Sequence, residues 1–112
     1  MGHAAKLLYD AGQVVLCTFI SPYAEDRQRV RELYPEGRFI EVYVKCNLNE
    51  AKRRDPKGLY NGAERGEIKN LTGVSAPYEE PEGAELTVDT TGLSAEKALR
   101  EVYVYLGEIG LR

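Results

Sequence analysis

The stretch Val14-Val15-Leu16-Cys17-Thr18-Phe19-Ile20 decides the fold class, because it is almost continuously apolar and rich in β-branched residues. Such a run is typical of a strand that is covered on both faces, as in a parallel sheet. A helical segment runs from Ser21-Pro22 to about Tyr34, and Phe39–Val44 is the next predicted strand. Strand, helix and strand in this order form a βαβ unit, so the sequence predicts an α/β fold with parallel pairing.

Boundary signals place the other elements around this unit. Ser21 is the predicted N-cap of the central helix, and Pro22 its first residue. A first helix is expected over residues 1–12, and a last helix after its N-cap Ser94. Their predicted buried faces consist of Ala4, Leu7, Leu8 and Ala11 in the first helix, and of Ala95, Ala98, Leu99, Val102, Leu106 and Ile109 in the last. Between them we expect short helices over 48–53 and 60–65 and a short strand over 86–88.

The composition is that of one globular domain. The chain has 112 residues, with 15 basic and 18 acidic side chains and a formal net charge of −3. This balance argues against a general nucleic-acid binder, and no apolar run approaches the ~20 residues of a membrane span. No signal peptide is recognisable at the start.

Cysteine and histidine usage argues against disulfides and metal ligation. Cys17 and Cys46 are the only cysteines, and His3 is the only histidine. No Cys-x-x-Cys pair exists, so we expect no metal site. Both thiols lie in or beside apolar runs and are expected to act as small hydrophobic groups in a reducing, cytoplasmic compartment.

A long excursion between the second and third predicted strands is the first place where chemistry is expected. The lid-like segment 54–83 is rich in glycine and proline. The stretch from Lys52 to Lys69, which overlaps the start of this segment, carries six cations and three anions, a net charge of +3 on an acidic body. This pattern suits closure over an anionic small ligand. A solvated charged loop explains it equally well.

The junction Phe19-Ile20-Ser21-Pro22-Tyr23 is the second such place. In open parallel sheets, ligands bind at the carboxyl ends of strands, and a helix N-terminus there offers backbone donors to phosphate. No activating base is adjacent to Ser21 in sequence, so the residues alone favour a capping role for it over a chemical one.

Four ordered motifs carry a family resemblance. They are Phe19–Tyr23, Glu36–Val42, Arg54-Asp55-Pro56-Lys57-Gly58-Leu59-Tyr60 and Gly66–Gly73. Together they closely resemble the C-terminal part of adenylylsulfate kinases, from about Ala4 to the end of the chain. The resemblance implies ATP-dependent phosphorylation of the 3′-hydroxyl of adenylylsulfate, which gives 3′-phosphoadenylylsulfate in sulfate assimilation. It also implies ATP as co-substrate with Mg²⁺.

The resemblance implies roles for individual residues. Ser21 matches the active-site phosphoserine of the family. Ile20, Ser21, Lys57, Asn70 and Leu71 match positions that line the adenylylsulfate pocket. Arg54 matches an arginine near the adenine of ATP, and Leu93 falls near another nucleotide contact. Leu71 stands where the family usually has phenylalanine, and Asn61-Gly62 replaces a basic pair.

The chain also departs from the family by an absence. No Gly-x-x-x-x-Gly-Lys-Ser/Thr string, which would cradle phosphate, occurs in it, nor do the magnesium-ligand and Asp-Gly-Asp motifs of the family. We therefore expect no activity from the isolated chain. Met1 falls in a helix that lies downstream of these motifs, so the chain is expected to be a fragment, a truncated reading frame or one piece of an assembly.

The resemblance implies a parallel three-layer sheet of the P-loop nucleotide-kinase type, with strand order 2-3-1-4-5. Residues 1–112 would form one partial domain holding three of the five strands: the third, fourth and fifth. The first strand would separate the third from the fourth, which leaves open edges. A non-catalytic remnant that binds adenylylsulfate, a homodimer and complementation by another chain therefore all stay open. Nucleic-acid binding through Lys52–Lys57 is weak, since no aromatic platform accompanies the charges.

Overall fold

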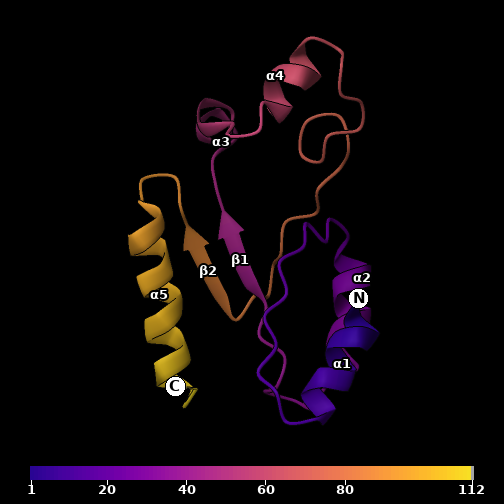
Figure 1. The fold of residues 1–112 in the computed structure, drawn as a ribbon, viewed down its shortest axis with the longest axis vertical. Helices are drawn as coiled ribbons and strands as arrows, with labels where there is room; N and C mark the ends of the chain where they lie inside the picture. The colour runs from indigo at the N-terminus through magenta and orange to yellow at the C-terminus, as the bar shows by residue number, and fades with distance from the viewer. Residues whose placement is uncertain (112) are drawn as a thin grey trace. The chain divides into compact units, whose positions relative to one another are not determined.

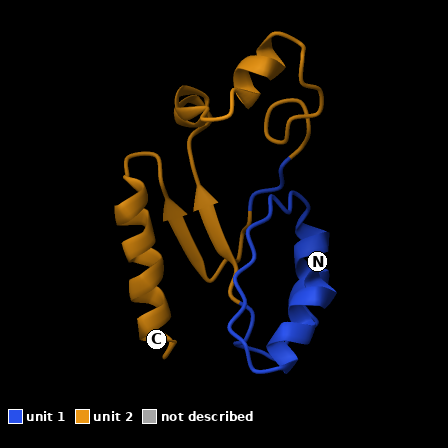
Figure 2. Cartoon of the chain, in the orientation of Figure 1, with its two compact units in different colours: residues 1–39, 78–80 blue, residues 40–77, 81–112 orange. Residues whose placement is uncertain are grey.

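The computed structural model describes residues 1–111 and is an α/β structure (Figure 1). The chain divides into two compact units, which are described separately: residues 1–39 with 78–80, and residues 40–77 with 81–112 (Figure 2). The elements in chain order are α1 (Gly2–Asp10), α2 (Ala24–Arg31), β1 (Val42–Lys45), α3 (Leu48–Arg54), α4 (Leu59–Glu64), β2 (Leu86–Asp89) and α5 (Ala95–Glu108).

Aromatic and close backbone contacts hold the two helices of the first unit together. The ring of Tyr34 packs edge-on against Tyr9, with 5.2 Å between centroids, and lies 5.7 Å from the ring of Phe39. Burial raises the pKa of the Tyr34 hydroxyl. Gly2 allows a close approach of α1 and α2, because a Cβ there would lie 2.9 Å from a methyl group of Val30. These contacts join α1 to the end of α2 and the turn that follows it.

The second unit is built on a parallel pair of strands. β1 pairs with β2 in the register Val42↔Leu86 to Lys45↔Asp89. α5 packs against β2 (Figure 1). Among the described residues, Val88 is the only hydrophobic side chain that is fully buried, with 1% of it exposed. The parallel pairing of the second and third predicted strands agrees with the strand order that the family resemblance implies. The pairing expected within the βαβ unit, between Val14–Ile20 and Phe39–Val44, is not formed among residues 1–111.

The predicted strand Val14–Ile20 is not formed. These residues are extended but join no ladder, and among residues 1–111 the named strands pair only with each other. Leu16 is 82% exposed, and Cys17 is exposed rather than an apolar packing group. A strand is defined by hydrogen bonds to a neighbour, and no neighbouring strand reaches this segment. The sheet accordingly has two strands instead of the three expected.

Helix boundaries and buried faces also differ from expectation. α2 begins at Ala24 after Tyr23, so Ser21 is not its N-cap and Pro22 precedes the helix. In α1 the apolar positions Leu7 and Leu8 are exposed. In α5 the half-buried residues are Ala98, Val102, Tyr105 and Leu106, whereas Ala95 is exposed, Leu99 is 68% exposed and Ile109 is also exposed. A spacing of three and four residues finds an apolar stripe, but the neighbouring elements decide which stripe is covered.

The short elements follow the prediction closely. Ser94 is the N-cap of α5, and its hydroxyl accepts from the amide of Lys97 at 3.2 Å. α3 and α4 lie within one residue of the predicted short helices. No helix in the described part of the chain combines the length and apolarity needed to cross a bilayer.

Candidate functional site

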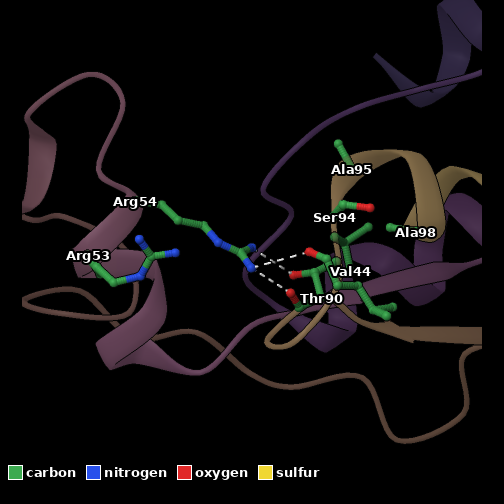
Figure 3. Close-up of a pocket in the computed structure, with 8 residues that line it drawn as sticks. Val44, Arg53, Arg54, Thr90, Ser94, Ala95 and Ala98 are labelled. Atoms are coloured by element: carbon green, nitrogen blue, oxygen red, sulfur yellow. Dashed lines mark hydrogen bonds between the residues drawn. The ribbon is translucent and has the colours of Figure 1, made fainter.

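A pocket lies at the carboxyl ends of the two parallel strands, within the second unit. Its volume is about 650 Å³, within the range of small-molecule sites. Val44 comes from β1, Thr90 follows β2, and Arg54 ends α3. The complete lining consists of Val44, Arg53, Arg54, Thr90, Leu93, Ser94, Ala95 and Ala98 (Figure 3). The location is the one expected of ligand sites in parallel sheets.

The loop after β2 is anchored to the end of β1. The amide of Thr90 donates to the carbonyl of Lys45 at 2.7 Å, and its hydroxyl donates to the same oxygen at 2.9 Å. The hydroxyl of Thr91 accepts from the amide of Asn47 at 2.9 Å. Asn47 itself caps α3, accepting from the amide of Asn49 at 2.8 Å. One wall of the pocket and the start of α3 are thus held by the same hydrogen-bond network.

Arg54 reaches from α3 to this loop (Figure 3). Its Nη2 donates to the carbonyl of Thr90 at 2.7 Å and lies 3.5 Å from the carbonyl of Leu93. Its Nε donates to Glu50 Oε1 at 2.8 Å, one helical turn back. The guanidinium group is therefore fixed at both ends. A fixed planar guanidinium stacks on a flat ring better than a freely rotating charged group does.

Glu50 is the anionic partner of both arginines of α3. Arg53 donates to it through Nε at 2.9 Å and through Nη2, and the carboxylate side chain is 19% exposed. The hydrogen bonds from Arg53, with those from Arg54, lower the pKa of Glu50 to about 2. Glu50 therefore stays ionised at neutral pH. Sequence reasoning missed it, although its spacing of four residues from Arg54 was a usable signal.

The lid-like segment is folded on itself. The carboxylate of Asp55 accepts from the amides of Tyr60 and Asn61, each at 3.1 Å. The carbonyl of Gly62 accepts from the amide of Ile68 at 3.1 Å. A Cβ at Gly62 would lie 2.5 Å from Ile68 Cδ1. The glycine that replaces a basic residue of the family pattern therefore makes room for an apolar contact.

Two lysines of this segment lack an acidic partner in the described part of the chain. Lys52 pairs with Glu64 at 3.7 Å, Arg65 pairs with Glu67 at 3.4 Å, and both arginines of α3 pair with Glu50. Lys57 and Lys69 are exposed and form no ion pair with any residue in the range 1–111. Their charge is the part of the cationic segment that is left to meet an anionic ligand.

The predicted site residues are distributed over both units. Ser21 and Ile20 lie in the first unit, and both are exposed. Lys57, Asn70 and Leu71 lie in the lid-like segment of the second unit. Asn70 has a φ of 58°, and the amide of Leu71 donates to the hydroxyl of Ser75 at 2.8 Å. Of the predicted nucleotide-binding residues, the structure brings Arg54 and Leu93 together in one pocket.

Nothing in the described residues gathers ligands for a metal. No group of three or more histidine, cysteine, aspartate or glutamate side chains lies close enough within residues 1–111 to hold an ion. The residues in the range 1–111 therefore offer no carboxylate or histidine cluster for the Mg²⁺ that the family resemblance implies.

Comparison with known proteins gives a consistent result. A profile described as adenylylsulphate kinase matches residues 1–89. A probable adenylyl-sulfate kinase of Halalkalibacterium halodurans is 51% identical over 106 residues, covering 95% of this chain and 52% of that protein. An adenylyl-sulfate kinase of Staphylococcus epidermidis is 49% identical over 108 residues, covering 96% of this chain and 54% of that protein. The chain spans about half the length of these curated relatives.

A solved structure resembles the fold over nearly the whole chain. The Mycobacterium tuberculosis APS kinase, solved in complex with AMPPNP and APS, superimposes with a TM-score of 0.80 and 37% sequence identity. The match covers 93% of this chain and 61% of that one. The fold is accordingly that of the P-loop kinases, represented here by a two-stranded part of the sheet.

Proposed function

Because this chain belongs to the adenylylsulfate kinase family, we propose that it supplies the adenine pocket and the lid for phosphorylation of adenylylsulfate. In that reaction the 3′-hydroxyl oxygen of adenylylsulfate attacks the γ-phosphorus of ATP. The bond to the β-phosphate oxygen breaks, ADP leaves, and the hydroxyl proton is released. The product is 3′-phosphoadenylylsulfate, an intermediate of sulfate assimilation, and the location proposed is the cytoplasm.

The observation that carries this proposal is the pocket around Arg54. A guanidinium held at both ends, by Glu50 and by the Thr90 carbonyl, presents a flat cationic face beside the apolar side chains of Val44 and Leu93. Adenine is flat, uncharged and apolar on its faces, so stacking on such a group is favourable. We assign this pocket to the adenine of ATP.

The unpaired lysines support the acceptor half of the proposal. Adenylylsulfate carries a phosphate and a sulfate, and Lys57 and Lys69 offer point charges that no carboxylate within residues 1–111 neutralises. Asn70 and Leu71 stand beside Lys69 in the chain and would contact the nucleotide. Ser21 is proposed as the family's phosphoserine position. The apolar side chain of Leu71 keeps contact with the base but not ring stacking.

The isolated chain is proposed to be inactive as a kinase. It contains no Gly-x-x-x-x-Gly-Lys-Ser/Thr string, and the triphosphate of ATP needs such a cradle of backbone amides. Residues outside this sequence that bear such a loop would have to complete the site.

A second function is favoured by one observation. Val14, Leu16, Phe19 and Ile20 are exposed on an extended segment that forms no ladder. An apolar extended segment of this kind can accept a strand from another chain. The alternative is therefore a non-catalytic remnant that binds adenylylsulfate, or that complements another subunit, including a second copy of itself.

Calorimetric titration of the purified chain tests the assignment. AMPPNP should bind the wild type, and Arg54→Ala should weaken it by about ten-fold, because a charged hydrogen-bonding group is lost. Lys57→Ala and Lys69→Ala should weaken adenylylsulfate by a similar factor, whereas Lys97→Ala on the surface of α5 serves as the control. Unchanged affinities in all three variants would contradict the assignment. Turnover by the purified chain alone would contradict the need for a separate phosphate loop.

A further inference from the structure

A three-residue segment from the far end of the lid-like region is hydrogen-bonded to the start of α2. Residues 78–80 belong to the first unit, although the chain before and after them belongs to the second (Figure 2). The amide of Glu79 donates to the carbonyl of Pro22 at 2.8 Å. The carboxylate of Glu79 accepts from the amide of Ala24, the first residue of α2, at 2.8 Å. One residue thus binds the backbone on both sides of Tyr23.

Arg27 closes the same arrangement from the helix. Its Nη1 donates to the carbonyl of Ser21 at 2.5 Å, and its Nη2 donates to the carbonyl of Glu79 at 2.7 Å. The guanidinium therefore bridges the serine and the lid-derived segment. We call Glu79 and Arg27, with the carbonyls of Ser21 and Pro22 and the amide of Ala24, the Glu79 clasp.

The backbone of Ser21 needs such support. Its φ is 44°, a left-handed value that residues with a Cβ adopt rarely. Strained conformations of this kind persist only where the surrounding structure holds them. The clasp holds the backbone at this point, because the carbonyl of Ser21 accepts from Arg27 and the carbonyl of the next residue, Pro22, accepts from the amide of Glu79. Without it, relaxation to an ordinary φ would redirect the serine hydroxyl.

The Glu79 clasp is connected through the chain to the lid-like segment. Glu79 follows the lid-like residues Lys57, Lys69, Asn70 and Leu71 in the chain, with Pro77 before it and Pro81 after it. The segment that holds Ser21 is therefore directly continuous in the chain with the lid-like residues. We propose that Glu79 is a positioning residue, which sets the backbone of Ser21 and links the state of the lid to the acceptor-site serine. This inference rests on the proposed function for the meaning of Ser21.

Two substitutions of Glu79 distinguish its proposed role in positioning Ser21 from a general loss of stability. Glu79→Gln keeps a carbonyl oxygen that can accept from the amide of Ala24, so the clasp should survive. Glu79→Ala removes the acceptor and should open it. Glu80→Gln, at the exposed neighbouring residue, is the matched control.

Three measurements are made on the full chain. Amide hydrogen exchange at Ala24 and the Cα chemical shift of Ser21 report the clasp itself, and calorimetry reports the binding of adenylylsulfate and of AMPPNP. In Glu79→Ala we expect about five-fold faster exchange at Ala24, as for loss of a helix cap, and a shift of the Ser21 resonance. We expect adenylylsulfate to bind about five-fold more weakly and AMPPNP to bind unchanged, while Glu79→Gln and Glu80→Gln resemble the wild type.

Each contrary outcome has a distinct meaning. Exchange in Glu79→Ala that equals that of Glu80→Gln would overturn the clasp. Faster exchange with unchanged adenylylsulfate affinity, or with an equal loss for AMPPNP, would overturn the positioning role. A wild-type chain that binds no adenylylsulfate would contradict the proposed function, and the exchange rates and the Ser21 shift would then decide the clasp alone.

Discussion

Truncation of Val88 is a direct test of how α5 covers the sheet. Val88→Ala removes two methyl groups from a β2 side chain that is only 1% exposed. Its register partner on β1 is Val44, which is 65% exposed although neighbours in a parallel ladder share a face. The reason is that α5 packs chiefly on β2. Val44→Ala is therefore a control of the same residue type in the same ladder.

The magnitude follows from the burial of the two valines. Two buried carbon groups are worth about 1.6 kcal/mol in transfer free energy. The space that they leave raises the loss for Val88→Ala to about 2 kcal/mol. Since Val44 is mostly exposed, the same truncation there should cost roughly 0.5 kcal/mol in transfer free energy. The lower strand propensity of alanine affects both variants alike, so the difference of about 1.5 kcal/mol isolates burial.

Equilibrium unfolding in urea, followed by circular dichroism, measures both variants against the wild type. If the slopes agree, the shift in midpoint gives the change in the free energy of unfolding. We expect a clearly lower midpoint for Val88→Ala and a small change for Val44→Ala. Equal losses, or a larger loss for Val44→Ala, would refute the reasoning, because α5 would then not be what distinguishes the two strands.

Three further predictions concern the arginine pair and the glycines. Glu50 has a folded-state pKa of about 2, below the usual 4.5, so the stability that its ion pairs contribute is complete above about pH 4.5 and is lost as the pH falls toward 2. Glu50→Gln should abolish this part of the pH dependence of the free energy of unfolding. A dependence that is unchanged between about pH 5 and pH 2 would contradict the ion pairs. Arg54→Lys should weaken AMPPNP by about five-fold in calorimetry, because an ammonium group has no flat face and cannot reach Glu50 and Thr90 together. Gly62→Ala should destabilise the chain by about 1 kcal/mol, because the new methyl group overlaps the side chain of Ile68. Gly107→Ala on α5 should stabilise the chain by about 0.5 kcal/mol, because the new methyl group meets open space. Thermal unfolding measures both variants, and a change of the same sign in both would refute the packing argument.

Local sequence signals determined the short elements. Ser94 was a correct N-cap, because the serine hydroxyl satisfies an amide only three residues away. The parallel pairing of Val42–Lys45 with Leu86–Asp89 agrees with the strand order that the family resemblance implies. The βαβ pairing predicted from chain order, between Val14–Ile20 and Phe39–Val44, is not formed among residues 1–111. A family motif pointed to Arg54, and a looser alignment with the family pointed to Leu93; the structure brings the two together in one pocket. The N-cap and the short helices depend on near neighbours in the chain, which can be read directly from the sequence.

Tertiary structure alone decided which apolar segments are covered and which polar groups meet. The run Val14–Ile20 has strong strand propensity, but a strand requires a hydrogen-bonded neighbour, and none reaches it within residues 1–111. The contact of Arg54 with Thr90 spans 36 residues, and that of Ala24 with Glu79 spans 55. No periodicity or capping pattern encodes such distances. They arise because the tertiary structure brings backbone and side-chain groups that are remote in the sequence within hydrogen-bonding distance.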